Sequence, residues 1–99
     1  MVPLMPFELI LTANVEATLE GIERDPPRLR KVQKCLAKLE NNPRQSGLNS
    51  HPYSQIQGPL GEKIFESYVE NHAPSAWRVW WYYGPEAETI VIVDLGPHP

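Results

Sequence analysis

The sequence predicts an α+β fold of the order β-α-α-β-β-β, in which a helical hairpin packs on one face of a small, mainly antiparallel sheet. Two observations carry this prediction. Between residues 14 and 41 the apolar side chains recur at helical spacing, whereas beyond residue 61 they alternate or run in short apolar segments. Proline and glycine separate these segments. We expect residues 1–99 to form a single domain.

The first half of the chain is expected to contain one strand and two helices. Residues 6–12 predict a short strand, and Asn14 is of a type preferred at a helix N-cap. Pro26-Pro27 ends the first helix and suits the first turn of the second. The second helix carries an apolar stripe over residues 29–39 with cations on its other faces, and it ends at 41–43. The two amphipathic helices should form a hairpin that lies on a sheet.

The second half is expected to be a loop followed by an antiparallel meander. Residues 43–60 are rich in Pro, Gly, Ser and Asn and predict the loop, with a short strand at its end. Three strands follow, over residues 62–71, 76–83 and 89–96. The helices should cover one face of the sheet and leave the second face open, which is where a site would lie.

Composition limits the classes of function. The net charge is −3, so no bulk positive field attracts nucleic acid, although a local basic patch remains possible. Cys35 is the only cysteine, which excludes an internal disulfide and suits a reducing compartment. Neither a signal peptide nor an apolar run long enough for a membrane span is recognised. We therefore expect a cytoplasmic protein.

Three stretches carry a family resemblance: LAKLENNPRQSGL (36–48), GEKIFESYVENHAPSAWRVWWYY (61–83) and IVIVDLGPHP (90–99). Together with the order of the elements, they resemble the RelE/ParE superfamily of bacterial type II toxins. The resemblance implies a cognate antitoxin as partner. It also implies either a metal-free nuclease that cuts messenger RNA on the ribosome, or a member of the same fold that only binds, such as a gyrase-directed toxin or a repurposed module. No cofactor is implied.

The resemblance singles out Arg78 as the residue that contacts the scissile phosphate in nucleases of this family. A fixed guanidinium stabilises the negative charge that builds on the phosphate when a 2′-hydroxyl attacks it. By alternation along the strand, Arg78 shares a face with Trp80 and Tyr82, which we expect to contact substrate. The opposite face, with Val79, Trp81 and Tyr83, suits packing on the helices. The alternative for Arg78 is an ordinary ion pair with Glu62, Glu66 or Glu70 on the next strand.

Three further residues are candidates for catalysis. His98 lies where family members place a terminal histidine or a basic residue, and it is the expected general acid; otherwise it is an ordinary tail residue. Lys63 and Glu66 are the expected phosphate ligand and general base. They have opposite parity in an unbroken strand, so both reach the site only if a bulge lies between them. A solvated strand edge and a cross-strand ion pair are the alternatives.

The remaining polar residues have weaker interpretations. His51 lies in the predicted loop 43–60, where relatives keep polar groups near the substrate, and it is the third expected substrate-binding residue. His72 fits an exposed turn residue. The three histidines and Cys35 lack ligand spacing, so no metal site is predicted. The cations of the second helix could meet ribosomal RNA phosphates or an acidic antitoxin segment, or could form a solvated face; they are Arg28, Lys31, Lys34 and Lys38.

The charge balance separates the two classes of function. Translation-dependent nucleases of this family are usually strongly basic, whereas this chain is acidic and has only Lys63 and Arg78 as fixed positive charges beyond residue 44. The acidic balance therefore favours a binding module, while Arg78 and the GPHP ending favour the nuclease. The sequence leaves the oligomeric state open, although an exposed aromatic strand would be a suitable dimer surface.

Overall fold

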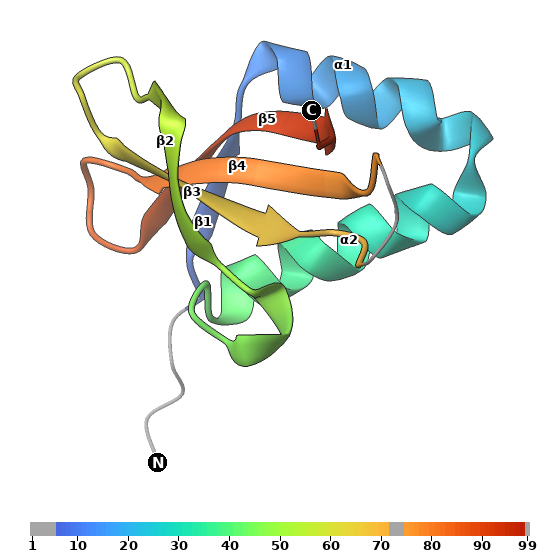
Figure 1. Ribbon diagram of the computed structural model, residues 1–99, viewed down its shortest axis with the longest axis horizontal. Coiled ribbons are helices and arrows are strands. Elements are labelled where there is room, and N and C mark those ends of the chain that lie inside the picture. Colours follow the sequence, from blue (N-terminus) through green and yellow to red (C-terminus); the bar gives the residue numbers. More distant parts are fainter. Residues whose placement is uncertain (1–5, 72–74, 99) are drawn as a thin grey trace.

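Two α-helices lie on one face of a five-stranded sheet (Figure 1), as a computed structural model describes for residues 6–71 and 75–98. The predicted α+β class and the helical hairpin are confirmed. The strands are β1 (Glu8–Leu11), β2 (His51–Gln57), β3 (Lys63–Tyr68), β4 (Trp77–Tyr83) and β5 (Thr89–Pro97). The helices are α1 (Ala13–Gly21) and α2 (Pro26–Asn41), with short 3-10 turns at Ile22–Arg24 and Ser46–Leu48.

The sheet has the strand order β1-β5-β4-β3-β2. The four strands of the second half pair antiparallel, and β1 joins the far edge parallel to β5, with Ile10 opposite Val91. Asp25 caps α2 by accepting the backbone N–H of Arg28 at 3.3 Å, and Pro26 and Pro27 occupy the first turn of this helix as predicted.

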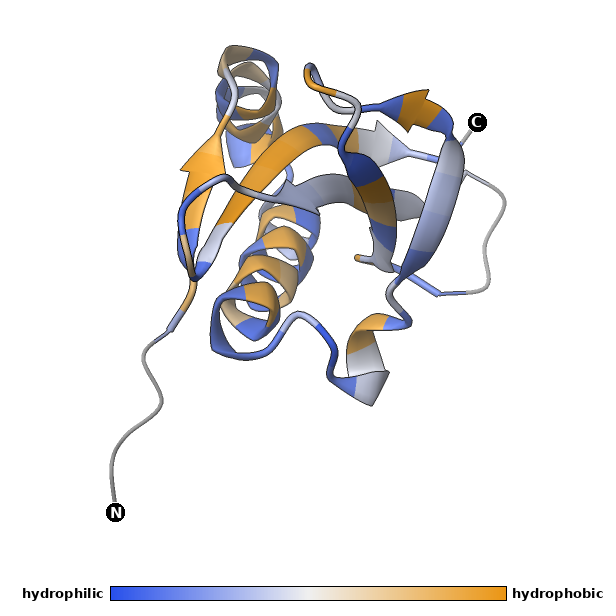
Figure 2. Cartoon of the chain, turned by 90° about the vertical axis from the view of Figure 1, so that its left-hand side faces the viewer, coloured by the Kyte–Doolittle hydropathy of each residue, from blue (hydrophilic) through white to orange (hydrophobic). Residues whose placement is uncertain are grey.

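The sequence-based prediction of a loop over residues 43–60 is only partly right, because β2 occupies seven residues of it. This strand is at the edge of the sheet, and all but one of its residues are exposed. Its colouring in Figure 2 is mainly that of polar residues, whereas apolar residues dominate β1 and β5. Pairing with β3 therefore makes it a strand, and Pro52 is tolerated because edge strands accept proline.

The predicted N-cap at Asn14 is wrong by two residues. Helix α1 begins at Ala13, with Thr12 in the capping position but without a side-chain cap bond. The amide of Asn14 instead donates to the carbonyl of Val93 at 3.1 Å and to a carboxylate oxygen of Asp94 at 3.3 Å. The amide oxygen of Asn14, the atom that a cap would use as acceptor, instead accepts the hydroxyl of Thr12 at 2.6 Å.

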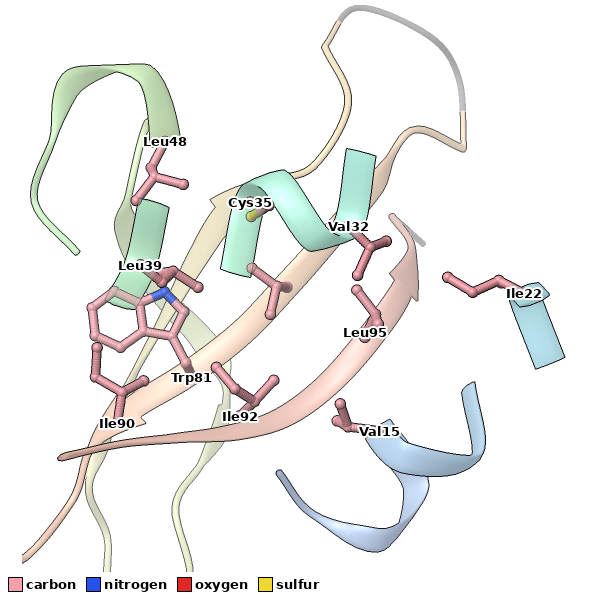
Figure 3. Packing of buried hydrophobic residues seen from close by; sticks show 11 residues of the cluster. Val15, Ile22, Val32, Cys35, Leu39, Leu48, Trp81, Ile90, Ile92 and Leu95 are labelled. Carbon is pink, nitrogen blue, oxygen red and sulfur yellow. The ribbon is translucent and has the colours of Figure 1, made fainter. Parts of the chain in front are cut away.

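The main core lies between the sheet and the helices. Trp81 is 1% exposed and packs with Ile90, Ile92 and, from α2, Leu39 (Figure 3). Other buried members come from α1, α2, the 3-10 turns and the sheet: Val15, Ile22, Val32, Cys35, Leu48, Val79 and Leu95. Val79 and Trp81 thus face the helices, as the alternation of β4 predicted.

The second face of the sheet is less open than predicted. Trp80 and Tyr82 are 5% and 7% exposed and form a smaller apolar cluster with Ile64 and Val91. Tyr53 of β2 lies against Trp80, with ring centroids 5.8 Å apart. Strand β2, which is longer than predicted, therefore closes part of this face and leaves a smaller polar region beside it.

Candidate functional site

A buried carboxylate gathers four polar side chains on the face of the sheet away from the helices. Glu66 is 3% exposed. Its Oε2 accepts the indole N–H of Trp80 at 2.9 Å and lies 3.6 Å from Nε2 of His98. Its Oε1 lies 3.1 Å from Nε2 of His51 and 3.9 Å from Nε of Arg78. These five residues are named the Glu66 cluster below.

Strand pairing explains why residues far apart in the sequence meet in the Glu66 cluster. Glu66 of β3 stands opposite Trp80 of β4 on one side and His51 of β2 on the other. Arg78 of β4 stands opposite Gly96 of β5, two residues before His98. The backbone N–H of His98 donates to the carbonyl of Ala76 at 2.9 Å and extends the pairing beyond β5. Directly opposed residues project to the same face, so four strands contribute to one site.

Arg78 is held rigidly. It is 8% exposed, and its guanidinium lies 3.7 Å from the ring centre of Tyr68. Its Nη1 donates to the backbone carbonyls of Glu70 and Trp77. Its Nε has no hydrogen-bond partner within the described residues and faces the Glu66 carboxylate. Arg78, which is expected to contact the scissile phosphate, is therefore held in one orientation. The alternative prediction for Arg78, a charge pair with a neighbouring glutamate, is found in the same geometry.

The two histidines are the accessible members of the Glu66 cluster. The side chains of His51 and His98 are 45% and 44% exposed, against 4% for Glu66. Nδ1 of His51 lies 2.8 Å from the carbonyl oxygen of Asn49. Since a carbonyl only accepts, Nδ1 carries the proton, and Nε2 is the nitrogen of His51 that can gain or lose one beside Glu66.

Two predicted site residues do not join the Glu66 cluster through a described contact. Lys63 lies over the ring of Phe65 at 5.9 Å, and Phe65 stacks on Trp81 on the helix side. The extra residues that shift the β2–β3 register lie in β2, between Pro52 and Gln57, and not between Lys63 and Glu66. Lys63 and Glu66 therefore project to opposite faces of the sheet. Tyr82 packs in the smaller apolar cluster beneath Trp80. His72 lies outside the described residues.

A groove of about 360 Å³ adjoins the Glu66 cluster. Its lining consists of Tyr53, Ile56 and Trp80 together with residues 94–97 at the end of β5, which include the carboxylate of Asp94. Aromatic walls of this kind accept the flat face of a nucleobase. The geometry thus combines a fixed cation, two histidines and an aromatic groove within one face of the sheet.

The sequence matches no protein-family model and no curated protein sequence. Solved structures do match. A YoeB/ParE toxin from Agrobacterium tumefaciens has a TM-score of 0.69 at 12% identity, covering 93% of this chain and 99% of that chain. The archaeal RelE–RelB complex from Pyrococcus horikoshii OT3 gives 0.67 at 15% identity over 94% and 96%. The toxin–antitoxin complex RelBE2 from Mycobacterium tuberculosis gives 0.62 at 17% identity over 94% and 99%.

The chain has the RelE/ParE fold. The resemblance drawn from the sequence is confirmed at the level of fold, which is what likeness at 12–17% identity shows. The similar structures include a toxin and a toxin–antitoxin complex. On this RelE/ParE fold the Glu66 cluster occupies the helix-free face of the sheet.

Other chemistries receive less support from the described residues. Burial raises the pKa of the Cys35 thiol to about 12, against the opposing effect of the nearby Lys38 ammonium, so Cys35 is a poor nucleophile. Within residues 6–71 and 75–98, no three potential ligands come together in a way that would hold a metal ion. No helix in the same residues has the length and apolar character needed to cross a membrane.

Sequence reasoning missed two aromatic residues of the site. Tyr68 lies under Arg78, and its ring meets that of His51 edge-on at 6.0 Å. The alternation of residues 62–71 already placed Tyr68 on the face of Glu66, so a signal for it existed. Tyr53 had no such signal, because it lies in β2, which the sequence does not predict at its full length.

Proposed function

We propose that this protein is the toxin of a type II toxin–antitoxin system and that it cuts messenger RNA on the ribosome without a metal ion. The observation that carries the proposal is the Glu66 cluster, in which one buried carboxylate faces two accessible histidines and a fixed arginine. The RelE/ParE fold supports the class of protein. A cognate antitoxin, the ribosome and messenger RNA are its proposed partners, and the cytoplasm is its proposed location.

The proposed cleavage uses the 2′-hydroxyl of the RNA as the nucleophile. His51 Nε2 accepts the hydroxyl proton, the 2′-oxygen bonds to phosphorus, and the bond from phosphorus to the 5′-oxygen breaks. His98 donates a proton to that leaving oxygen, in the role that the family resemblance implies for it. Arg78 stabilises the extra negative charge on the phosphate. The products are a 2′,3′-cyclic phosphate and a 5′-hydroxyl end.

Glu66 has an electrostatic role in this proposal rather than the base role that the family resemblance implies. It is buried behind both histidines, and one of its oxygens is already bonded to the indole of Trp80. A carboxylate beside Nε2 of His51 stabilises the imidazolium that forms when this nitrogen takes a proton, while the bond from Nδ1 to the carbonyl of Asn49 orients the ring. Trp80 in turn immobilises Glu66 and also lines the groove proposed for a base.

A binding module on the same fold is the second candidate, because two observations favour it. Arg78 is 8% exposed and already contacts two carbonyls, an aromatic ring and, at 3.9 Å, the carboxylate of Glu66. The net charge of −3 is also unusual for a protein that approaches the ribosome. Under this candidate the protein captures a partner, such as gyrase or an antitoxin, without cutting RNA.

A bacterial cell-free translation reaction tests the proposal. Purified wild type is added and the ends of the reporter messenger are mapped, with and without ribosomes. We expect new ribosome-dependent 5′-hydroxyl ends that disappear with Arg78→Gln and decrease about a hundredfold or more with His98→Gln. Lys63→Gln is the matched control, since it removes a cation of the helix side and should leave cleavage unchanged.

Thermal unfolding of each variant shows whether loss of cleavage reflects loss of folding. If Arg78→Gln does not fold, Arg78→Lys replaces it, because lysine keeps the charge without the planar fork. An intact messenger with folded wild type would reject the nuclease and direct the work to gyrase assays and antitoxin capture.

A further inference from the structure

A second polar cavity lies on the helix side of the Glu66 cluster. It has a volume of about 320 Å³ and is formed between α2 and the end of β3. Its charged lining consists of Lys31, Lys34 and Lys38 from α2 and Glu70 from beyond β3, with Tyr68 as an aromatic wall. The spacing of the lysines places them on one face of the helix. This space is named the lysine cavity below.

The only carboxylate that lines the lysine cavity within the described residues is already neutralised. Glu70 accepts the backbone N–H of Trp77 at 3.0 Å and lies 3.3 Å from the Lys31 ammonium and 3.7 Å from the Arg28 guanidinium. Partial burial would raise the pKa of Glu70, but this hydrogen bond and these two cations together hold that pKa below its usual range. The site therefore already stabilises one oxyanion.

Two lysines of the cavity remain without an acidic partner. Among residues 6–71 and 75–98, no carboxylate lies within 4.0 Å of the ammonium groups of Lys34 or Lys38. An unpaired cationic pair in a concave site attracts an anion.

The charge distribution along the chain reinforces this point. Six of the nine Lys and Arg residues, but only one of the twelve Asp and Glu residues, lie at positions 24–38. The rest of the protein is strongly acidic and repels polyanions. A polyanion can therefore approach favourably only at this part of the surface, around α2.

Tyr68 connects the lysine cavity to the Glu66 cluster. It lines the cavity, and its ring also supports the Arg78 guanidinium at 3.7 Å. Arg78 in turn donates to the backbone carbonyl of Glu70, another lining residue. Two cationic sites that share walls fit a ligand with repeated negative charges, as in a nucleic-acid strand.

We propose that the lysine cavity binds a backbone phosphate of single-stranded RNA next to the phosphate held at Arg78, with Lys34 and Lys38 as its principal ligands. The inference rests on the proposed function only because it takes the same RNA strand as the ligand of both sites. It accounts for how an acidic chain can hold RNA.

Fluorescence anisotropy with a short, labelled 2′-O-methyl oligouridine tests the inference, since this probe lacks the hydroxyl needed for cleavage. The variant is Lys34→Gln with Lys38→Gln, and the control is Arg24→Gln with Arg30→Gln. The control removes the same charge from exposed positions that do not line the cavity. We expect the lysine variant to weaken binding by about tenfold and to reduce the slope of log K against log salt by about 0.7, the value for one phosphate of a single strand, with a clearly smaller change in the control.

Equal binding by both variants, or no binding by wild type, would overturn the inference. An unchanged affinity of the lysine variant for RNA, together with loss of binding to a labelled oligoglutamate peptide, would also overturn it and assign the cavity to an acidic protein segment. Lysine-dependent RNA binding without cleavage in the translation reaction would support the inference and reject only the nuclease.

Discussion

Trp80 and Trp81 are neighbours in β4, yet their indole N–H groups serve opposite faces of the sheet. Trp81 donates to the hydroxyl of Ser67 at 2.8 Å inside the core beneath the helices, and this hydroxyl lies 2.6 Å from that of Ser50. Trp80 donates to the carboxylate of Glu66 at 2.9 Å. Both bonds link β4 to β3, both are buried, and in both the donor is an indole N–H.

The difference lies in what each bond holds in place. On the helix side, the acceptor is a neutral hydroxyl whose other partner is the hydroxyl of Ser50, so the bond contributes to stability alone. On the other side, the acceptor is a charge that two histidines and an arginine approach, so the bond positions reactive groups. Substitutions on the two faces should therefore separate stability from function.

The largest expected effect is on stability, from Trp81→Ala. This change empties a large volume of the main core, and we expect it to lower the free energy of unfolding by about 3–5 kcal/mol. Urea denaturation followed by circular dichroism measures it. Leu60→Ala is the control, because Leu60 is 88% exposed and its loss should change stability by less than about 0.5 kcal/mol. If Trp81→Ala lowered the free energy of unfolding as little as the control does, the helix side of the sheet would not be the stabilising face, and the comparison of the two faces would fail.

The sharpest test pairs Glu66→Gln with Ser67→Ala. Each change alters one acceptor of an indole N–H, and we expect each to lower stability by about 1–3 kcal/mol. Only Glu66→Gln should reduce RNA cleavage, by about a hundredfold, because it removes the charge that stabilises the imidazolium of His51. Mapped RNA ends and urea denaturation are measured on both proteins. Equal loss of cleavage in the two variants would mean that the faces do not differ in function.

A smaller effect is expected in the pH dependence of stability, from Glu70 at the edge between the two faces. Its pKa is lowered in the folded protein, so its contribution is complete above the ordinary glutamate value of about 4.3 and is lost as the pH falls through the folded pKa. Glu70→Gln should therefore be less stable than wild type at neutral pH, by about 1 kcal/mol or less, and equal to it in acid. Thermal unfolding across this pH range measures the difference. A constant difference at every pH would exclude the ionic contribution.

The smallest expected effect is chemical, at the thiol of Cys35 on the helix side. With a pKa raised to about 12 by burial, the thiol should react with a disulfide reagent at pH 8 only as fast as the protein unfolds. The colour released by Ellman's reagent, with and without urea, measures this rate. Rapid reaction in native protein would show that the core face opens more readily than its packing indicates.

Much of the fold could be predicted because its signals are local. The apolar stripe of α2, Pro26-Pro27 in the first turn of this helix and the alternation of β4 each lie within one element. The full length of β2 was not predicted, because an exposed edge strand with a proline has no apolar alternation. The N-cap was misplaced because Asn14 bonds to β5, a contact that depends on residues 93 and 94.

The candidate site was predicted as a list of residues rather than as an arrangement. Arg78, Glu66 and His98 were named from the resemblance, and His51 was assigned only a minor role in a loop. Their meeting at one carboxylate, with Lys63 left on the other face, follows from the pairing of His51 with Glu66 and of Glu66 with Trp80.

The sequence by itself determined which face of each element is apolar. The backbone sets the period of a helix or strand, and the order of apolar and polar residues along the segment shows which side chains share a face. Only the tertiary structure decided which polar residues stand opposite one another. That choice depends on the register of hydrogen bonds between strands distant in the chain, where a shift of one residue would turn Glu66 into the core and leave both histidines without their shared partner.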